Sequence, residues 1–159
     1  MNNNTLLQLK NVSKEFGTGT IDEVRALDGI NIDIQSGDFI TVIGSNGAGK
    51  STLLNLIAGV FPPDKGGTIL INGKDISHLS EHRRARYFGR VYQDPHVGTA
   101  ANMTIGENMS LAALRGASRG LKTAASKKNL SQYKELLATL HLGLEDRMST
   151  MVGTLSGGQ

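Results

Sequence analysis

The spacing of apolar residues predicts β-strands in the first part of the chain. Residues 7–12 alternate well enough for a strand, and residues 30–34 alternate strictly, which is typical of a half-buried antiparallel strand. Residues 39–43 form a nearly continuous β-branched run, which predicts a strand buried on both faces. Residues 68–71, followed by the Asn-Gly pair at 72–73, predict a further strand and a tight turn.

Helical spacing appears once before the middle of the chain and dominates its last third. Residues 52–60 predict a helix that ends near a glycine, and Ser80 is a candidate cap for a short basic helix over 81–87. Further helical patterns cover residues 105–114 and 130–142.

The change from strand to helix patterns divides the chain near residue 95. A short strand is expected at 90–92, and no internal repeat or low-complexity tract is present. The length is that of one ordinary domain. We therefore expect two parts within one domain, residues 1–95 and residues 96–159.

Composition excludes several classes of protein. Of the 159 residues, 38% are hydrophobic and 19% are charged, which fits a soluble globular protein. The absence of cysteine excludes disulfides and thiolate metal sites. The start of the chain does not resemble a signal peptide, and no run of roughly 18 apolar residues occurs, so we expect a cytoplasmic protein. A net charge of +3 is compatible with an anionic ligand or a membrane surface but identifies neither.

Residues 44–51 match the G-x-x-x-x-G-K-S pattern of a phosphate-binding loop (P-loop) in full. Such glycines let backbone N–H groups converge on phosphate oxygens at a helix N-terminus. The ammonium of Lys50 would reach the β- and γ-phosphates, and the hydroxyl of Ser51 would ligate Mg²⁺. A glycine-rich turn without a ligand is the alternative, which the expected strand before and helix after disfavour. We expect a site for ATP and Mg²⁺ formed by Gly44, Ser45, Asn46, Gly47, Ala48, Gly49, Lys50, Ser51 and Thr52.

The last five residues, Leu-Ser-Gly-Gly-Gln at 155–159, resemble the signature of ABC ATPases. A chance match to all five is expected in fewer than roughly one in a thousand chains. With the P-loop upstream, the chain resembles this family from residue 7 to residue 159. The resemblance implies an α/β P-loop NTPase fold with an N-terminal antiparallel β subdomain, part of a parallel core sheet and a helical subdomain. This fold would be incomplete here.

The resemblance also assigns roles outside the P-loop. Phe16 stands where the family places an aromatic ring that stacks on adenine, although by itself it fits a core or surface aromatic. Gln93 resembles the Q-loop glutamine, a catalytic residue that touches Mg²⁺ and the attacking water. The signature would contact the nucleotide held by a second subunit, through Ser156, Gly157, Gly158 and Gln159.

The partners that the resemblance implies are proteins, with no nucleic acid among them. Two ATPase subunits, most simply two copies, would pack head to tail so that each ATP lies between one P-loop and the partner's signature. Residues 93–96 and 103–108 would line the groove for a transmembrane permease, which would hold the subunit on the inner face of the cell membrane. Residues 107–116 and 142–147 resemble import ATPases that work with extracytoplasmic substrate-binding proteins, among them those for aromatic amino acids. A basic cluster is expected to be a solvated face or a lipid headgroup contact: Arg115, Arg119, Lys122, Lys127 and Lys128.

The chain departs from the family pattern after the signature. The Asp and catalytic Glu of the Walker B strand, the D-loop and the switch histidine would all follow Gln159. We therefore expect little hydrolysis by these 159 residues, an open sheet edge and poor solubility. The histidines are expected to lie at the surface: His78, His82, His96 and His141. A soluble ABC ATPase acting on ribosomes or DNA and a noncatalytic nucleotide-binding module remain alternatives.

Overall fold

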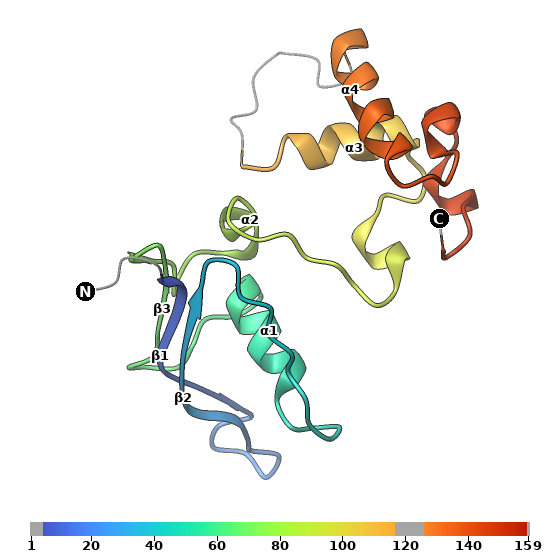
Figure 1. The fold of residues 1–159 in the computed structure, drawn as a ribbon. Coiled ribbons are helices and arrows are strands. Elements are labelled where there is room, and N and C mark those ends of the chain that lie inside the picture. Colours follow the sequence, from blue (N-terminus) through green and yellow to red (C-terminus); the bar gives the residue numbers. More distant parts are fainter. Residues whose placement is uncertain (1–4, 117–125, 159) are drawn as a thin grey trace. The chain divides into compact units, whose positions relative to one another are not determined.

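The computed structural model describes residues 5–116 and 126–158, which form two compact units (Figure 1). The first unit is Met1–Phe88 and the second is Gly89–Gln159. The first contains β1 (Thr5–Phe16), β2 (Val24–Gln35), α1 (Lys50–Ala58), β3 (Thr68–Ile71), β4 (Lys74–Asp75) and α2 (Glu81–Arg84). The second contains α3 (Ile105–Ala113), α4 (Lys127–Ala138) and three 3₁₀ turns, η1 (Pro95–Gly98), η2 (Leu144–Arg147) and η3 (Val152–Thr154).

The strands of the first unit form an antiparallel sheet in the order β2-β1-β3-β4. Strand β1 pairs with β2 along its whole length and with β3 over its first part. The expected turn at 72–73 joins β3 to β4, with Asn72 and Gly73 both at positive φ (47° and 75°). Two successive residues of this kind suit the right-handed twist of a tight hairpin. The strands predicted at 7–12, 30–34 and 68–71 are therefore confirmed, as is the antiparallel pairing expected for 30–34.

Helix α1 packs on one face of this sheet through an aliphatic core. Leu7 and Leu9 of β1 are buried in alternation, as the period of two requires, and so are Ile69 and Ile71 of β3. Val12 joins the same core after a register shift in the pairing of β1 with β2. Leu56 of α1 is fully buried among them. The core consists of Leu7, Leu9, Val12, Leu27, Leu56, Ile69, Ile71 and Ile76.

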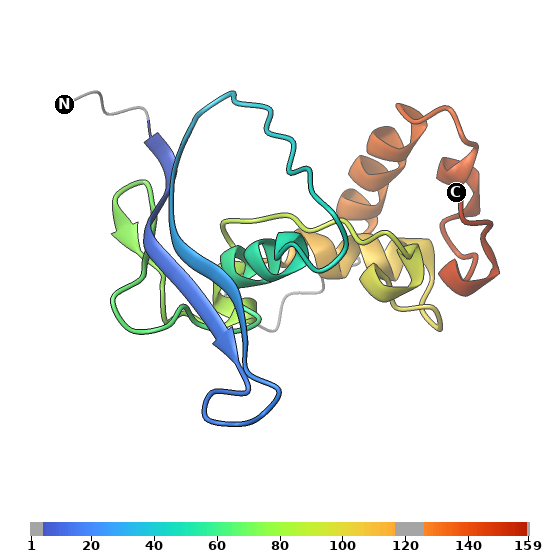
Figure 2. The same cartoon turned by 90° about the horizontal axis from the view of Figure 1, so that it is seen from below.

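The strand predicted at 39–43 is absent from this structure. The segment after β2 runs as an extended arc to α1 with no strand beside it (Figure 2). Phe39 is 95% exposed and Ile43 is 88% exposed, so the expected burial on both faces is wrong here. β-branched residues favour a strand only where neighbouring strands supply hydrogen bonds and packing. The described residues supply no such neighbour to this segment, and the short strand expected at 90–92 is missing for the same reason.

Helix positions agree with the sequence pattern, and their ends differ. Helix α1 begins at the P-loop lysine, and α4 begins three residues before the predicted 130 and ends at Ala138. Helix α2 is a single turn, shorter than 81–87. Ser80 occupies its N-cap position, but the hydroxyl bonds to Nδ1 of His82 (3.0 Å) and not to a backbone N–H.

Arg84 of α2 is buried, with 1% of its surface exposed, and ties α2 to the end of α1. Its Nη1 donates to the carbonyls of Leu56 (2.7 Å) and Ile57 (2.9 Å), near the C-terminus of α1. Its Nη2 and Nε donate to the carbonyls of Ser77 (2.7 Å) and Leu79 (2.9 Å). Burial lowers the pKa of Arg84, and the nearby Asp75 carboxylate partly offsets this effect. The cation thus satisfies carbonyls at the negative end of the helix dipole.

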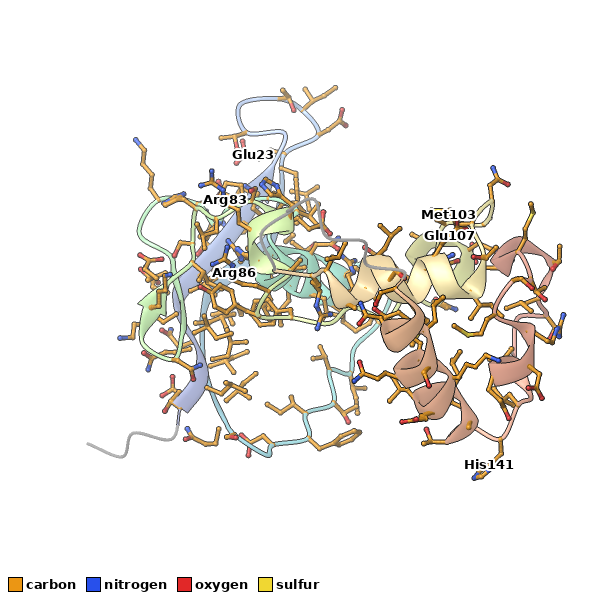
Figure 3. All side chains as sticks on the ribbon, turned by 90° about the horizontal axis from the view of Figure 1, so that it is seen from above. Glu23, Arg83, Arg86, Met103, Glu107 and His141 are labelled. Atoms are coloured by element: carbon orange, nitrogen blue, oxygen red, sulfur yellow. The ribbon has the colours of Figure 1, made fainter. Side chains whose placement is uncertain are left out.

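In the second unit, side chains organise the approach to α3. Thr104 and Glu107 form a reciprocal capping box, and the hydrogen bonds from the backbone and the hydroxyl of Thr104 lower the pKa of Glu107. Figure 3 shows Glu107 beside Met103 at the start of this helix. The amide of Asn108 donates to the carbonyls of Ala100 (3.1 Å), Met103 (3.3 Å) and Thr104 (3.0 Å), and its Oδ1 accepts from the N–H of Ala100 (2.8 Å). One side chain therefore fixes the loop at 100–104.

Replacing Arg84 by methionine should destabilise the first unit strongly. The substitution keeps an apolar stem but leaves buried carbonyls without donors, so we expect the free energy of unfolding to fall by about 3 kcal/mol or more. Urea denaturation of both proteins measures the difference. Arg83→Met is the matched control, because Arg83 lies on the same helix but is exposed (Figure 3). Equal stability of the two variants would contradict the anchoring role.

Replacing Asn108 by aspartate should loosen the loop at 100–104. Aspartate keeps the shape and the acceptor but removes the donor to three carbonyls, which should cost about 1–3 kcal/mol. Hydrogen exchange of the Gly153 amide, which donates to the carbonyl of Ala101 in this loop (2.9 Å), should quicken accordingly. The same change at the exposed Asn102 should leave that exchange rate unchanged; a similar effect at both positions would argue against a specific role for Asn108.

Candidate nucleotide-binding site

The P-loop lies between the extended segment that follows β2 and the first turn of α1. Lys50 is the first residue of that helix, and its Nζ donates to the carbonyls of Gly44 (2.7 Å) and Ser45 (2.6 Å). The N–H of Ala48 donates to the carbonyl of Ser45 (3.3 Å). The lysine therefore bends back along the loop, and its ammonium lies next to the loop's backbone.

Gly49 closes the P-loop against strand β2. It is buried at the N-cap of α1 with φ of 83°, a conformation that L side chains rarely adopt. A Cβ at this position would lie 2.4 Å from the carbonyl oxygen of Ala26 and 3.1 Å from Cδ2 of Leu27. Only glycine allows this close approach, so the last glycine of the motif is required by packing as well as by conformation.

The start of α1 is an electrostatically positive site. Gly49 supplies no side-chain cap, and the first turn contains no acidic residue. The N–H groups at a helix N-terminus carry partial positive charge, to which Lys50 adds a full charge. The group that complements this arrangement is an anion with several acceptor oxygens, such as a phosphate. Ser51 is exposed and Thr52 is half-buried in the same turn.

Phe16 lies at the end of β1, in the same unit as the P-loop. It pairs with Val24 of β2, and Ala26, whose carbonyl Gly49 approaches, lies two residues further along that strand. Two residues of a strand span about 7 Å. Phe16 is 40% exposed, and its ring packs edge-to-face against Phe61. The structure therefore brings the predicted base-stacking residue and the P-loop to the same end of β2.

Gln93 belongs to the second unit and is exposed there. It directly precedes Asp94, whose carboxylate accepts from the N–H of His96 (2.9 Å) and so begins the 3₁₀ turn η1. This hydrogen bond caps the turn immediately after the glutamine.

The signature is anchored by its first residue. Leu155 is half-buried against the core of the second unit, which is built on Ile105, Leu137 and Leu144. The residues that follow, Ser156, Gly157 and Gly158, are exposed. A Cβ on either glycine would meet no atom within 4 Å. Gln159 lies outside the described residues.

A comparison with protein families decides the identity of the chain. The family described as ABC transporter matches residues 27–159. The chain belongs to the ABC transporter family.

Relatives of this ABC transporter chain carry different transport names. It is 39% identical over 154 residues to a tyrosine transport ATP-binding protein of Clostridioides difficile (strain R20291), covering 97% of the chain and 61% of that protein. It is 35% identical over 160 residues to the macrolide export ATP-binding/permease protein MacB of Hyphomonas neptunium (strain ATCC 15444), covering 97% of the chain and 23% of that protein. A solved ATP-binding cassette, a dimeric post-hydrolysis state bound to ADP and Pi, matches with a TM-score of 0.73 and 26% identity, over 97% of the chain and 65% of that structure.

These comparisons confirm the expected fold class and show how much of a family member the chain represents. The solved neighbour is an ABC cassette, of which this chain covers 65%, and the described residues form an antiparallel sheet and helices. The chain spans 61% of the length of the tyrosine transport relative.

The structure describes the predicted surface histidines of this ABC transporter chain and part of its predicted basic cluster. His78, His82, His96 and His141 are all exposed, as expected, and His141 projects beyond the end of α4 (Figure 3). Among the described residues, no group of three or more His, Cys, Asp or Glu side chains could hold a metal ion. Within the same residues no helix is long and apolar enough to cross a membrane. Of the predicted basic cluster, Arg115 is exposed, whereas Arg119, Lys122 and the side chains of Lys127 and Lys128 lie outside the description.

Three residues next to the site were missed by sequence reasoning: Lys14, Phe61 and Asp64. Nζ of Lys14 bonds to Oδ1 of Asp64 (2.7 Å), and the other carboxylate oxygen accepts from the N–H of Glu15 (2.7 Å). No motif links these positions, because the loop after α1 meets β1 only in the folded chain. The only sequence feature that indicated an ordered loop at this position was the Pro-Pro-Asp turn at 62–64.

The charge of Asp64 is stabilised by this contact. Burial by itself would raise the pKa of Asp64, but the hydrogen bonds from Lys14 and from the N–H of Glu15, together with the charge of Lys14, outweigh it and lower the pKa. A carboxylate whose pKa is lower in the folded state contributes stability above its unfolded pKa and loses that contribution as the pH falls through the folded pKa.

The Asp64 contact should therefore make stability sensitive to acid. We expect the free energy of unfolding of the wild-type chain to drop as the pH falls below about 4. Asp64→Asn should be less stable than wild type at neutral pH and should converge toward it in acid. Denaturation curves across this range test the difference, with exposed Asp33→Asn as the control. A constant gap between wild type and Asp64→Asn would refute the assignment.

Proposed function

We propose that this chain binds Mg-ATP through its P-loop as part of the ATP-binding subunit of an ABC transporter. The observation that carries the proposal is the positive charge at the start of α1, where Lys50 lies beside helix N–H groups that have no side-chain cap and the first turn contains no acidic residue. The solved cassette that the chain resembles is described as bound to ADP and Pi, which supports a nucleotide as the anion.

Different residues of the first unit bind the phosphates, the metal ion and the base of the nucleotide. The backbone of Gly44, Ser45, Asn46, Gly47, Ala48 and Gly49 holds the phosphates, with Thr52 in the first turn of α1. Lys50 leaves its carbonyl partners for the β- and γ-phosphates, to which it makes stronger, charge-assisted bonds. Ser51 would supply a hydroxyl ligand to Mg²⁺, and the ion would offset the negative charge of the phosphates. Phe16 stacks on the base, about two strand residues from the point where Gly49 meets β2.

The residues of the second unit act in the assembled protein. Gln93 is proposed to contact Mg²⁺ and the attacking water. The exposed Ser156, Gly157 and Gly158, with Gln159, are proposed to contact the nucleotide of a second ATPase subunit, most simply another copy. Both glycines are exposed, and their lack of a side chain would let a partner's phosphate approach their backbone closely.

Transport is proposed to follow from nucleotide-driven closing and opening of that dimer against a permease. The subunit would lie on the inner face of the membrane, held there by the permease, with an extracytoplasmic substrate-binding protein as an indirect partner. Import of a small molecule is the proposed direction, supported by the resemblance of residues 107–116 to import ATPases. One relative is named for macrolide export, so a transport assay is needed to test the direction of transport.

Titration calorimetry of the chain with Mg-ATP tests the nucleotide site. Lys50→Ala removes two charge-assisted contacts and should weaken binding on the order of 100-fold. Ser51→Ala should weaken Mg-ATP binding while affecting metal-free ATP much less. The exposed Lys65→Ala, in the same unit, is the control for lost charge.

The outcomes separate the parts of the proposal. Wild-type affinity in Lys50→Ala would refute the P-loop as the phosphate site. Phosphate release measured in the same samples tests the expectation that these 159 residues turn over ATP near the background rate.

A further inference from the structure

The loop after α1, residues 59–67, is fixed against strand β1. The N–H of Asp64 donates to the carbonyl of Ser13 (3.1 Å), and its carboxylate accepts from Lys14 (2.7 Å) and from the N–H of Glu15 (2.7 Å). Three bonds to three consecutive residues of β1 leave the loop little freedom to move. Phe61 belongs to this loop, and Phe16 ends this strand.

The two phenylalanine rings meet in a defined geometry. Their centroids are 5.4 Å apart and their planes are inclined by 87°, an edge-to-face contact. Nζ of Lys14 lies 5.7 Å from the centroid of Phe16 and 5.8 Å from that of Phe61. Asp64 also binds this ammonium, so the cation is held in place next to both rings.

The two rings differ in what supports them. Phe61 is half-buried and packs against the main core of the first unit. Phe16 is the more exposed ring, at the end of a strand and before a turn. The orientation of Phe16 therefore depends on Phe61 more than the orientation of Phe61 depends on Phe16.

We propose that Phe61 is a positioning residue for base binding. It fixes the ring plane of Phe16, and Phe16 in turn stacks on the nucleotide base. The inference rests on the proposed nucleotide-binding function and extends it to a residue with no part in the P-loop. A ring that is already oriented loses little freedom when a base stacks on it, so ordering of Phe16 before binding increases affinity. The effect concerns the base alone, since the phosphates are bound by the P-loop.

The test compares Mg-ATP with Mg-tripolyphosphate, which has the phosphates but no base. Phe61→Leu keeps an apolar side chain against the core and removes the ring. We expect its affinity for Mg-ATP to fall roughly three- to tenfold while its affinity for Mg-tripolyphosphate stays unchanged. Phe61→Tyr retains the ring and should restore wild-type affinity for Mg-ATP.

Two further variants separate positioning from general stability. Phe88→Leu makes the same change at another phenylalanine packed on this core and should alter neither affinity. Phe16→Ala combined with Phe61→Leu should bind Mg-ATP no more weakly than Phe16→Ala alone, because Phe61 acts through Phe16.

Several results would overturn the proposal. Unchanged Mg-ATP affinity in Phe61→Leu, an equal loss for both ligands, or additive losses in the double variant would each do so while leaving the P-loop site intact. A wild-type chain that binds neither ligand would instead refute the proposed function, and this inference with it.

Discussion

Helix α1 is held at both of its ends, and the arrangement of the first unit depends on this constraint. At its start, Gly49 approaches the carbonyl of Ala26 so closely that no side chain fits between them. At its end, Arg84 donates to the carbonyls of Leu56 and Ile57 while lying almost fully buried. Between these points Leu56 enters the core. A helix fixed in this way presents its positive N-terminus in one direction, which a phosphate site requires.

The same helix also determines where the loop at 59–67 begins. From the end of α1 the chain crosses to β1, where Asp64 bonds to Lys14 and to the backbone on either side of it. This contact brings Phe61 to Phe16 and so joins the residues around the proposed base to those around the proposed phosphates. The strand is separated in sequence from the helix and the loop that follows it, and they meet only in the folded chain.

In the second unit, polar side chains hold the loop before α3 in place. This unit has a small apolar core, so the loop before α3 is fixed chiefly by Asn108 and the capping box of Thr104 and Glu107. Two carbonyls of this loop accept hydrogen bonds from η3. The N–H of Gly153 donates to the carbonyl of Ala101 (2.9 Å), and the N–H of Val152 donates to that of Met103 (3.0 Å). These bonds hold the turn that ends in Leu155, from which the exposed signature residues extend.

Local sequence determined the elements whose cause is local. The P-loop, the Asn-Gly hairpin and the positions of α1, α3 and α4 follow from glycine conformation, turn chemistry and helical period, all of which act within a few residues. Sequence also indicated the family, because the P-loop and the signature are short motifs in fixed order. It failed at 39–43, where a β-branched run has no neighbouring strand among the described residues and remains exposed. The roles of Arg84 and the meeting of Phe16 with Phe61 were decided by tertiary structure alone, because each needs partners that only the folded chain brings within bonding distance.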